Sequence, residues 1–270
     1  MSKSEKEKII MDVKKLEKQL GRRPTKHDNG ALYNKSRKYF GSWNKMMEKG
    51  GYLVNYYQYP KIPNKLNSDL SYFLGLIITD GHLQYNKKYG VYLFTSYEEE
   101  KRMILKLIKK LFNYNAKANK RKKYGFNKRS NFQITINSKA LVNCLNTKFN
   151  MPIGNKSLTA RVPRIINSSN KNIASFIRGV IDGDGHITRG TVHISSGSYL
   201  FLTDIKRLLS KLFIKCKSKI EKRKTCYVLN LNKHESSIIY DNCYDKAKYF
   251  YPRKKHKILK TNILKNINCD

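Results

Sequence analysis

The hydrophobic residues of the chain follow two different spacings, which alternate along its length. Near the start, Ile9, Val13, Leu16 and Leu20 are three or four positions apart, as in an amphipathic helix, and Gly21 follows as a stop signal. Further on, short stretches alternate apolar and polar residues, which is the period of a half-buried strand. The pattern therefore predicts a fold to which both helices and hairpins contribute.

Residues 1–51 predict a small domain of three helices. We expect the second helix to begin at Thr25, because Asp28 stands three residues later, as in a capping box. Ser42 is expected to cap the third helix, which carries the apolar residues Trp43, Met46 and Met47. Helix-turn-helix DNA-binding proteins use compact bundles of this kind, so we expect DNA binding here rather than a plain helical cap.

The next segment, residues 52–68, is predicted to be a linker, because Pro60 and Pro63 interrupt regular structure. It separates the helical domain from the long remainder of the chain.

That remainder contains a repeat. The segments SYFLGLIITDGHL (71–83) and SFIRGVIDGDGHI (175–187) align without a gap, and six of their thirteen positions are identical. Each is followed by two short alternating stretches, a helix, two further strands and a helical region. We therefore predict an α+β fold with pseudo-twofold symmetry, made of two αββαββα halves at residues 69–165 and 166–270.

Composition narrows the class of partner. Lys and Arg number 56 against 19 Asp and Glu, a formal net charge of +37, which predicts binding to a polyanion and to nucleic acid first. No apolar run is long enough to cross a bilayer, and the start of the chain lacks the apolar core of a signal peptide. The five cysteines are scattered without a C-x-x-C pair, as in a reduced intracellular protein. We expect an intracellular protein that is neither secreted nor bound to a membrane.

Small residues mark one face of each repeated segment when it is drawn as a helix. Gly75 and Thr79 lie four positions apart, and so do Gly179 and Gly183. Small side chains at this spacing allow two helix backbones to approach closely. The two segments are therefore expected to pack against each other.

If they do, Asp80 and Asp184 emerge side by side where the helices end. Two adjacent carboxylates repel each other unless a cation lies between them, and Mg²⁺ prefers oxygen ligands of this kind. With phosphate oxygens added, this is a common arrangement for phosphodiester hydrolysis. Asp182 has no such partner, because its counterpart in the first segment is Ile78, and we expect it to form local hydrogen bonds or to act as an accessory acid.

The segments FLGLIITDG (73–81) and IRGVIDGDG (177–185) resemble the paired motifs of the LAGLIDADG homing endonucleases. The first departs from the family pattern at Ile78, where an acid is usual, and the second at Arg178, where a small residue is usual. Residues 5–51, which contain the segments LGRRPT and FGSWNKMMEKGG, also resemble a helical repeat often found beside homing endonucleases.

This resemblance implies a monomer that cuts both strands of double-stranded DNA at a long asymmetric site during intron homing, leaving 3′ overhangs. The sheets would lie over the major groove, and Asp80 and Asp184 would bind Mg²⁺, for which Mn²⁺ can substitute. The family also places a basic residue near each scissile phosphate. Lys156 and Lys254 stand at comparable places, with Arg253 and Lys255 as competitors of Lys254.

Alternation along the predicted strands sorts their two faces. In NFQITIN (131–137), Phe132, Ile134 and Ile136 are expected to face the core, and Val192 and Ile194 in the second half. The opposite faces present amide, hydroxyl and imidazole groups suited to base edges. The residues expected to bind DNA through these groups are Asn131, Gln133, Thr135, Asn137, Thr191, His193 and Ser195. Lys217, Lys219 and the basic segment 120–129 are expected to contact phosphates.

Two function classes remain open. The first is a Mg²⁺-dependent, site-specific DNA endonuclease. The alternative is a non-cleaving protein on the same fold, either a maturase that binds intron RNA or a DNA-binding regulator. Both acids are retained, which favours the nuclease. The ends of the chain lack the residues that an intein needs, so an intein is not expected.

Overall fold

The protein is described from a computed structural model, which covers residues 3–54, 58–85, 89–121, 131–212, 215–255 and 258. The chain divides into two compact units, Met1–Gln58 and Tyr59–Asp270. Most of the basic segment 120–129, for which phosphate contacts were predicted, lies outside the described residues.

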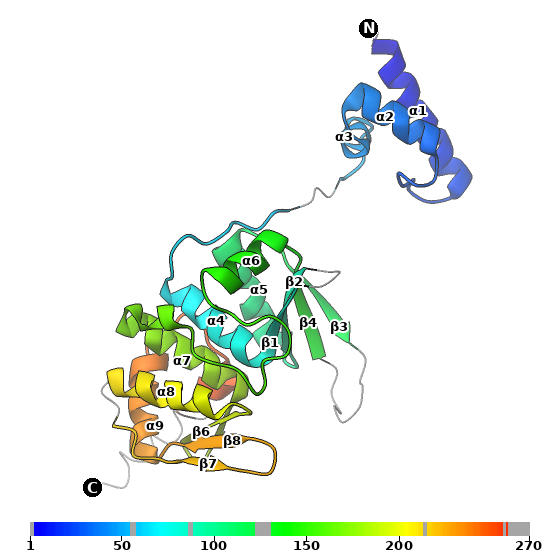
Figure 1. Ribbon diagram of the computed structural model, residues 1–270. Coiled ribbons are helices and arrows are strands. Elements are labelled where there is room, and N and C mark those ends of the chain that lie inside the picture. Colours follow the sequence, from blue (N-terminus) through cyan, green and yellow to red (C-terminus); the bar gives the residue numbers. More distant parts are fainter. Residues whose placement is uncertain are drawn as a thin grey trace. The chain divides into compact units, whose positions relative to one another are not determined.

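The first unit is a bundle of three helices, α1 (Lys3–Leu20), α2 (Gly30–Phe40) and α3 (Trp43–Lys49) (Figure 1). Their apolar faces share a small core formed by Ile9, Val13, Leu32, Trp43, Met46 and Met47. The predicted cap of the third helix is confirmed, because the Ser42 side chain accepts a hydrogen bond from the backbone N–H of Lys45.

The predicted start of the second helix at Thr25 is wrong. The helix begins at Gly30, with Asn29 as its N-cap. Asp28 instead accepts hydrogen bonds from the backbone and the hydroxyl of Thr25, at 2.7 and 2.9 Å, and forms an ion pair with Arg22. These local bonds satisfy the side chain in a turn, which competes with helix formation.

The second unit contains the predicted duplication. Its first half runs α4 (Ser68–Asp80), β1 (Gly81–Gln84), β2 (Gly90–Thr95), α5 (Glu98–Phe112), β3 (Lys117–Arg121), β4 (Asn131–Ile136) and α6 (Lys139–Thr147). Its second half runs η1 (Arg164–Ser168), α7 (Asn170–Asp184), β5 (Gly185–Thr188), β6 (Thr191–Ser196), α8 (Tyr199–Lys211), β7 (Ile220–Lys222), β8 (Tyr227–Asn230), α9 (Lys233–Ile239) and the π-helical turn η2 (Tyr240–Tyr244).

Each half forms one four-stranded antiparallel sheet, and the two sheets have equivalent strand orders, β1-β2-β4-β3 and β5-β6-β8-β7. In Figure 1 the first sheet lies beside α4 and the second beside α7. The predicted α+β fold with two αββαββα halves and a preceding helical unit is confirmed.

The two repeated helices, α4 and α7, pack directly against each other, as their small residues predict. A Cβ atom added to Gly75 would lie 2.5 Å from the backbone oxygen of Phe176 and 2.9 Å from Cα of Gly179. A Cβ added to Gly179 would in turn meet the backbone oxygen of Tyr72. Only glycine permits this approach, and the apolar residues around it are buried in one core shared by both halves.

Candidate active site at the paired helix ends

Asp80 and Asp184 are the last residues of α4 and α7, and the helix contact brings them to the same place. The strands β1 and β5 begin at the following glycines, Gly81 and Gly185, so each carboxylate lies at a junction between helix and strand. An Oδ2 atom of Asp80 lies 3.5 Å from where a Cβ on Gly183 would stand, so this glycine gives the carboxylate access to the other helix end.

The surroundings disfavour the charged form of both acids. Burial, together with the charge of Asp184, raises the pKa of Asp80 to about 7. Burial also raises the pKa of Asp184, whose side chain keeps access to solvent, while Lys156 and Lys254 lower it. Both acids also lie at the negative C-terminal ends of their helices. A divalent cation would relieve this concentration of negative charge, so the donor set fits a hard cation with oxygen ligands.

Each helix end also receives one lysine. The Nζ atom of Lys156 donates to the backbone oxygens of Thr79, at 3.3 Å, and Gly81. The Nζ atom of Lys254 donates to those of Ile181, at 3.3 Å, and Gly185. The two lysines therefore occupy corresponding positions beside the two carboxylates.

The neighbours of Lys254 in sequence make other contacts. Arg253 forms an ion pair with Glu100, and Lys255 donates to the backbone oxygen of Asp245 at 3.2 Å. Among the three basic residues that the sequence left open, Lys254 is the one at the end of α7. Burial and the charge of Arg253 lower its pKa to about 8.

Asp182 and Arg178, two unusual residues of the second motif, hold the C-terminal segment against α7. Asp182 is fully buried and accepts hydrogen bonds from the Tyr72 and Tyr244 hydroxyls, at 2.7 and 2.8 Å, and from the backbone N–H of Tyr251 at 2.8 Å. Arg178 donates to the backbone oxygens of Cys243 and Tyr249. Of the two roles expected for Asp182, the structure supports hydrogen bonding. The segment that it anchors carries Arg253 and Lys254.

Replacement of Asp182 by Ala is expected to destabilise the second unit by about 3 kcal/mol or more, because it leaves buried donors and the Arg178 charge without their partner. Urea denaturation should show a lower midpoint than for the native protein. The control is Asp241→Ala, at an exposed acid of the nearby turn η2, which should change the midpoint little. Equal midpoints for the two variants would contradict the anchoring role of Asp182.

Asp80 provides a test of the electrostatics in its own right. Its folded pKa, about 7, exceeds the ordinary value of 3.8, so the folded protein binds a proton more tightly and loses stability as pH rises from about 4 to 8. In EDTA, Asp80→Asn should therefore raise stability at pH 8 by on the order of 1–2 kcal/mol, after screening by solvent, and change it little at pH 4. Thermal unfolding at the two pH values measures this difference. A gain that does not depend on pH would refute the electrostatic explanation.

The residues predicted to read bases lie on the open faces of both sheets, with one beyond a strand end. In the first sheet, Ile134 and Ile136 are buried, while Gln133 and Thr135 are half-buried on the opposite face. Phe132 was predicted to face the core, but it is only half-buried and contacts the ammonium group of Lys101. Asn131 is half-buried at the start of β4, and Asn137 is exposed just after its end.

In the second sheet, Val192 and Ile194 are buried, and Thr191, His193 and Ser195 are half-buried on the other face. The imidazole of His193 forms hydrogen bonds with Asn230, at 2.8 Å, and Thr191, at 2.9 Å. These bonds fix the imidazole ring on the polar face of the second sheet. Lys217 and Lys219 are exposed in the segment that precedes β7, outside the strand itself.

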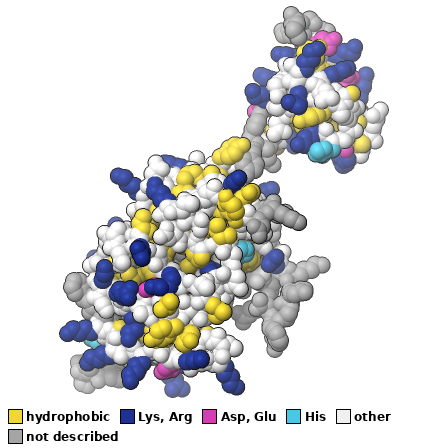
Figure 2. Space-filling view, viewed as in Figure 1, with side chains coloured by type: hydrophobic (Ala, Val, Ile, Leu, Met, Phe, Trp, Pro, Cys, Tyr) yellow, Lys and Arg dark blue, Asp and Glu magenta, His cyan; other side chains and the backbone are white. Residues whose placement is uncertain are grey.

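Strand β3 adds exposed polar residues to the face of the first sheet that carries Gln133 and Thr135, and of these only Arg121, in the basic segment 120–129, was among the predicted DNA contacts. Lys117, Asn119 and Arg121 are exposed on this strand and pair in register with Thr135, Gln133 and Asn131 of β4. The sequence of β3, KANKR, contains too few apolar residues to show the apolar–polar alternation of a strand. Lysines and arginines are spread widely over the visible surface, with few acids among them (Figure 2).

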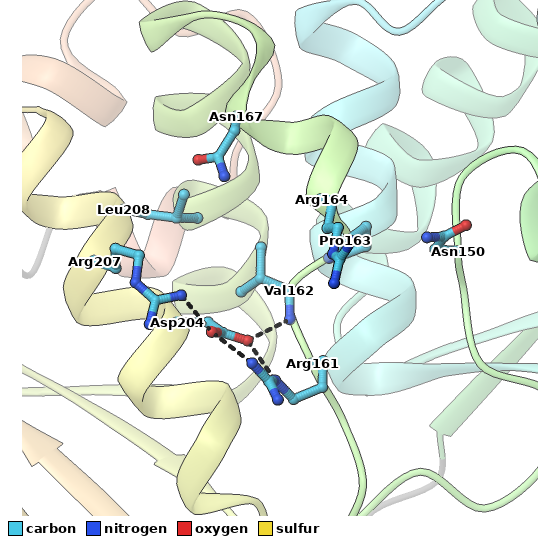
Figure 3. A pocket seen from close by; sticks show the side chains of 9 residues that line it. All are labelled: Asn150, Arg161, Val162, Pro163, Arg164, Asn167, Asp204, Arg207 and Leu208. Atoms are coloured by element: carbon cyan, nitrogen blue, oxygen red, sulfur yellow. Dashed lines mark hydrogen bonds and ion pairs between the residues drawn. The ribbon is translucent and has the colours of Figure 1, made fainter.

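A cavity of about 370 Å³ does not include any of the predicted site residues. It contains Asp204, which pairs with Arg161 at 2.7 Å and with Arg207 at 3.3 Å (Figure 3). Asp204 and Arg207 both belong to α8, whereas Arg161 precedes η1, so the Arg161–Asp204 ion pair fastens the segment between the halves to α8. The cavity is therefore assigned a structural role.

Within the described ranges, no three or more His, Cys, Asp or Glu side chains are arranged to hold a metal ion. A cation at Asp80 and Asp184 would need further oxygen ligands from phosphate and water. None of the described helices is both long and apolar enough to cross a membrane.

Two family models match the chain. A LAGLIDADG-like domain covers residues 171–242, and a homing endonuclease associated repeat covers residues 4–52. The first match includes the second motif helix and its sheet, and the second match includes the helical unit. The resemblance inferred from the two motifs and the N-terminal segment is confirmed.

Two curated relatives match part of the chain. It is 26% identical over 176 residues to a probable translation initiation factor IF-2 of Thermococcus kodakarensis, and 28% identical over 167 residues to a glutamine–fructose-6-phosphate aminotransferase of Methanocaldococcus jannaschii. These segments are 62% and 60% of this chain, which spans only 14% of the length of each relative. Neither named activity is carried over, because the matched segment is a small part of two differently named proteins.

Solved structures share the fold. Variants of the homing endonuclease I-DmoI match with a TM-score of 0.52 and 19% identity, over 74% of this chain and 97% of theirs. I-DmoI in complex with DNA and Mn matches with a TM-score of 0.51 and 20% identity, over 67% and 98%. Full-length DUF199/WhiA from Thermatoga maritima matches with a TM-score of 0.50 and 16% identity, over 75% and 62%. At these identities the likeness establishes the architecture alone.

Proposed function

Since this chain carries the LAGLIDADG fold together with a homing endonuclease associated repeat, we propose that it is a divalent-metal-dependent DNA endonuclease that cuts both strands at a specific site. The observation that carries the proposal is the pairing of Asp80 and Asp184 at adjacent helix ends, each with a lysine beside it. One carboxylate and one lysine would serve each strand.

The fold neighbours support DNA as the substrate. I-DmoI was solved in complex with DNA and Mn, with DNA and Ca, and, as a variant, with its target DNA and Mg. In this chain the two sheets would lie along the duplex, with polar side chains towards base edges and basic side chains towards phosphates. The net charge of +37 supports the same partner. We infer a monomer, because the two halves already supply one site for each strand, and a DNA substrate implies action inside the cell.

The residues at the helix ends would divide the work of hydrolysis. Asp80 and Asp184 would hold the cation, which when bound supplies charge neutralisation at the phosphate and acidifies a water. Lys156 and Lys254, fixed on backbone oxygens, would hold an ammonium group close to each phosphate and stabilise charge that develops there. The sheets would orient the duplex so that one phosphodiester of each strand meets one carboxylate.

A second candidate is a protein on the same fold that binds DNA or intron RNA without cutting it. The fold likeness to DUF199/WhiA keeps this candidate open, because that protein shares the architecture and its name does not describe a nuclease. Retention of both acids in the two motifs favours cleavage.

The proposal is tested by incubating the purified protein with a library of random DNA duplexes in Mg²⁺ or in EDTA and sequencing all new ends. Discrete breaks with 3′ overhangs, present only in Mg²⁺, would support the nuclease and give its target site. Selective retention of DNA or RNA without any break, in Mg²⁺ and in Mn²⁺, would favour the non-cleaving candidate.

A further inference from the structure

A second cavity, of about 250 Å³, opens beside Asp80. Asp80, Gly183, Arg253, Asn131, the end of β2 and the start of α5 line it. Its volume is several times the share of about 30 Å³ that one water occupies, so a phosphate group fits within it. The cavity is thus a polar space directly next to one of the two candidate catalytic acids.

Arg253 is held rigidly at this cavity. Its Nε atom donates to Oε1 of Glu100 at 2.6 Å, and its guanidinium lies 4.5 Å from the centre of the Tyr97 ring. Glu100 also accepts a hydrogen bond from the Thr95 hydroxyl at 2.5 Å. The Glu100 side chain is 3% exposed and that of Arg253 is 37% exposed, so a buried carboxylate fixes an accessible cation.

The fixed orientation leaves the far end of the guanidinium for a ligand. Glu100 engages Nε, and across the described residues neither Nη1 nor Nη2 of Arg253 donates a hydrogen bond to the protein. A guanidinium presents its donors in a planar fork that matches the oxygens of a phosphate. Asp80 lines the same cavity as Arg253.

The ion pair between Glu100 and Arg253 has no counterpart at the equivalent positions of the other half. Glu100 is the third residue of α5, and the third residue of α8 is Phe201, which is buried and apolar. The residue before Lys254 is Arg253, whereas the residue before Lys156 is the exposed and uncharged Asn155. The Asp184 side of the site therefore lacks both members of the ion pair.

We propose that Arg253 binds the phosphodiester of one DNA strand in the cavity beside Asp80, and that Glu100 is the residue that positions it. This inference rests on the proposed function and adds an asymmetry to it. One strand is cut with the help of a guanidinium that the other strand does not meet. Loss of Arg253 would consequently slow one strand and leave a nicked duplex whose intact strand is always the same.

The test uses a duplex containing the site selected from the library, with a different dye on each strand, under single-turnover conditions in Mg²⁺. Arg253→Gln should slow one strand by about 100-fold and the other by less than about threefold. Glu100→Gln should slow the same strand by a smaller factor, and Arg253→Lys should restore part of the rate. The control, Lys255→Gln, changes a neighbouring cation of the same segment and should leave both rates unchanged.

Equal slowing of both strands, or no slowing, would overturn the proposal. A second measurement stands independently of cleavage, namely the salt dependence of DNA binding. If Arg253 contacts a phosphate, Arg253→Gln should reduce the slope of log K against log salt by about 1, whereas Lys255→Gln should not. A native protein that cuts no site would refute the proposed function, and an unchanged slope would then refute the phosphate contact as well.

Discussion

Replacement of Asp80 or Asp184 by Asn is expected to reduce double-strand cleavage by at least about 10³-fold while leaving DNA affinity within about tenfold. The amide keeps the size of the side chain but removes the negative charge that a cation needs at the helix end. Binding depends mainly on many lysines, arginines and polar groups of the sheets, which these substitutions leave in place. Each variant should still permit some nicking if its partner acid serves the other strand alone.

Cleavage of the selected site and fluorescence anisotropy of the same duplex measure the two quantities side by side. Asp241→Asn is the matched control, since it removes one acid from an exposed turn. It should cut and bind like the native protein. Cleavage at the native rate by both Asp80→Asn and Asp184→Asn would show that these acids do not form the catalytic centre.

Gly179→Val is expected to prevent the second unit from folding, at a cost of more than about 3 kcal/mol. The first added carbon would already meet the backbone oxygen of Tyr72 and come within 3.0 Å of Cα of Gly75. Backbone atoms cannot move aside without separating α4 from α7, which would open the shared core and part the two acids. Circular dichroism and urea denaturation should show the loss, with Gly75→Val behaving alike.

The neighbouring position supplies a control for this steric argument. Thr79 and Gly183 occupy equivalent positions of the two motifs, and a Cβ on Gly183 would collide with the Thr79 side chain. Gly183→Thr alone should destabilise the unit, whereas the exchange Thr79→Gly with Gly183→Thr should restore much of the lost stability. An exchange no more stable than the single variant would contradict close packing at this point of the helix contact.

The duplicated architecture could be predicted from the sequence because its signals are local and repeated. The gapless motif pair gave the helix contact through Gly75 and Gly179, and the motif ends gave Asp80 and Asp184. Because the two motifs are similar, the structure predicted for one also had to suit the other. The placement of β-branched residues on the buried face of β6 followed equally from a period of two.

The remainder depended on contacts between distant segments. Nothing near Glu100 indicates that it pairs with Arg253, which lies in the other half of the chain. Asp182 shows the same limit, since its partners Tyr72 and Tyr244 are far away in sequence and only the fold brings them to one carboxylate. At Asp28 the reverse occurred, because a local motif typical of a helix start was satisfied by a turn. Local sequence motifs favour a helix or a turn, but they do not include the tertiary contacts that decide between the two.

The most direct test of the central claim is to locate the cation on the polypeptide. Fe²⁺ would replace Mg²⁺ in the complex of the protein with its selected DNA site, and ascorbate with peroxide would generate radicals that cut the chain next to the bound iron. If Asp80 and Asp184 bind the cation, the chain should be cut at the ends of α4 and α7. Excess Mg²⁺ should suppress this scission, and so should the double variant Asp80→Asn with Asp184→Asn. Scission at other segments only, from a protein that still cuts DNA in a Mg²⁺-dependent way, would contradict the assignment of the paired aspartates.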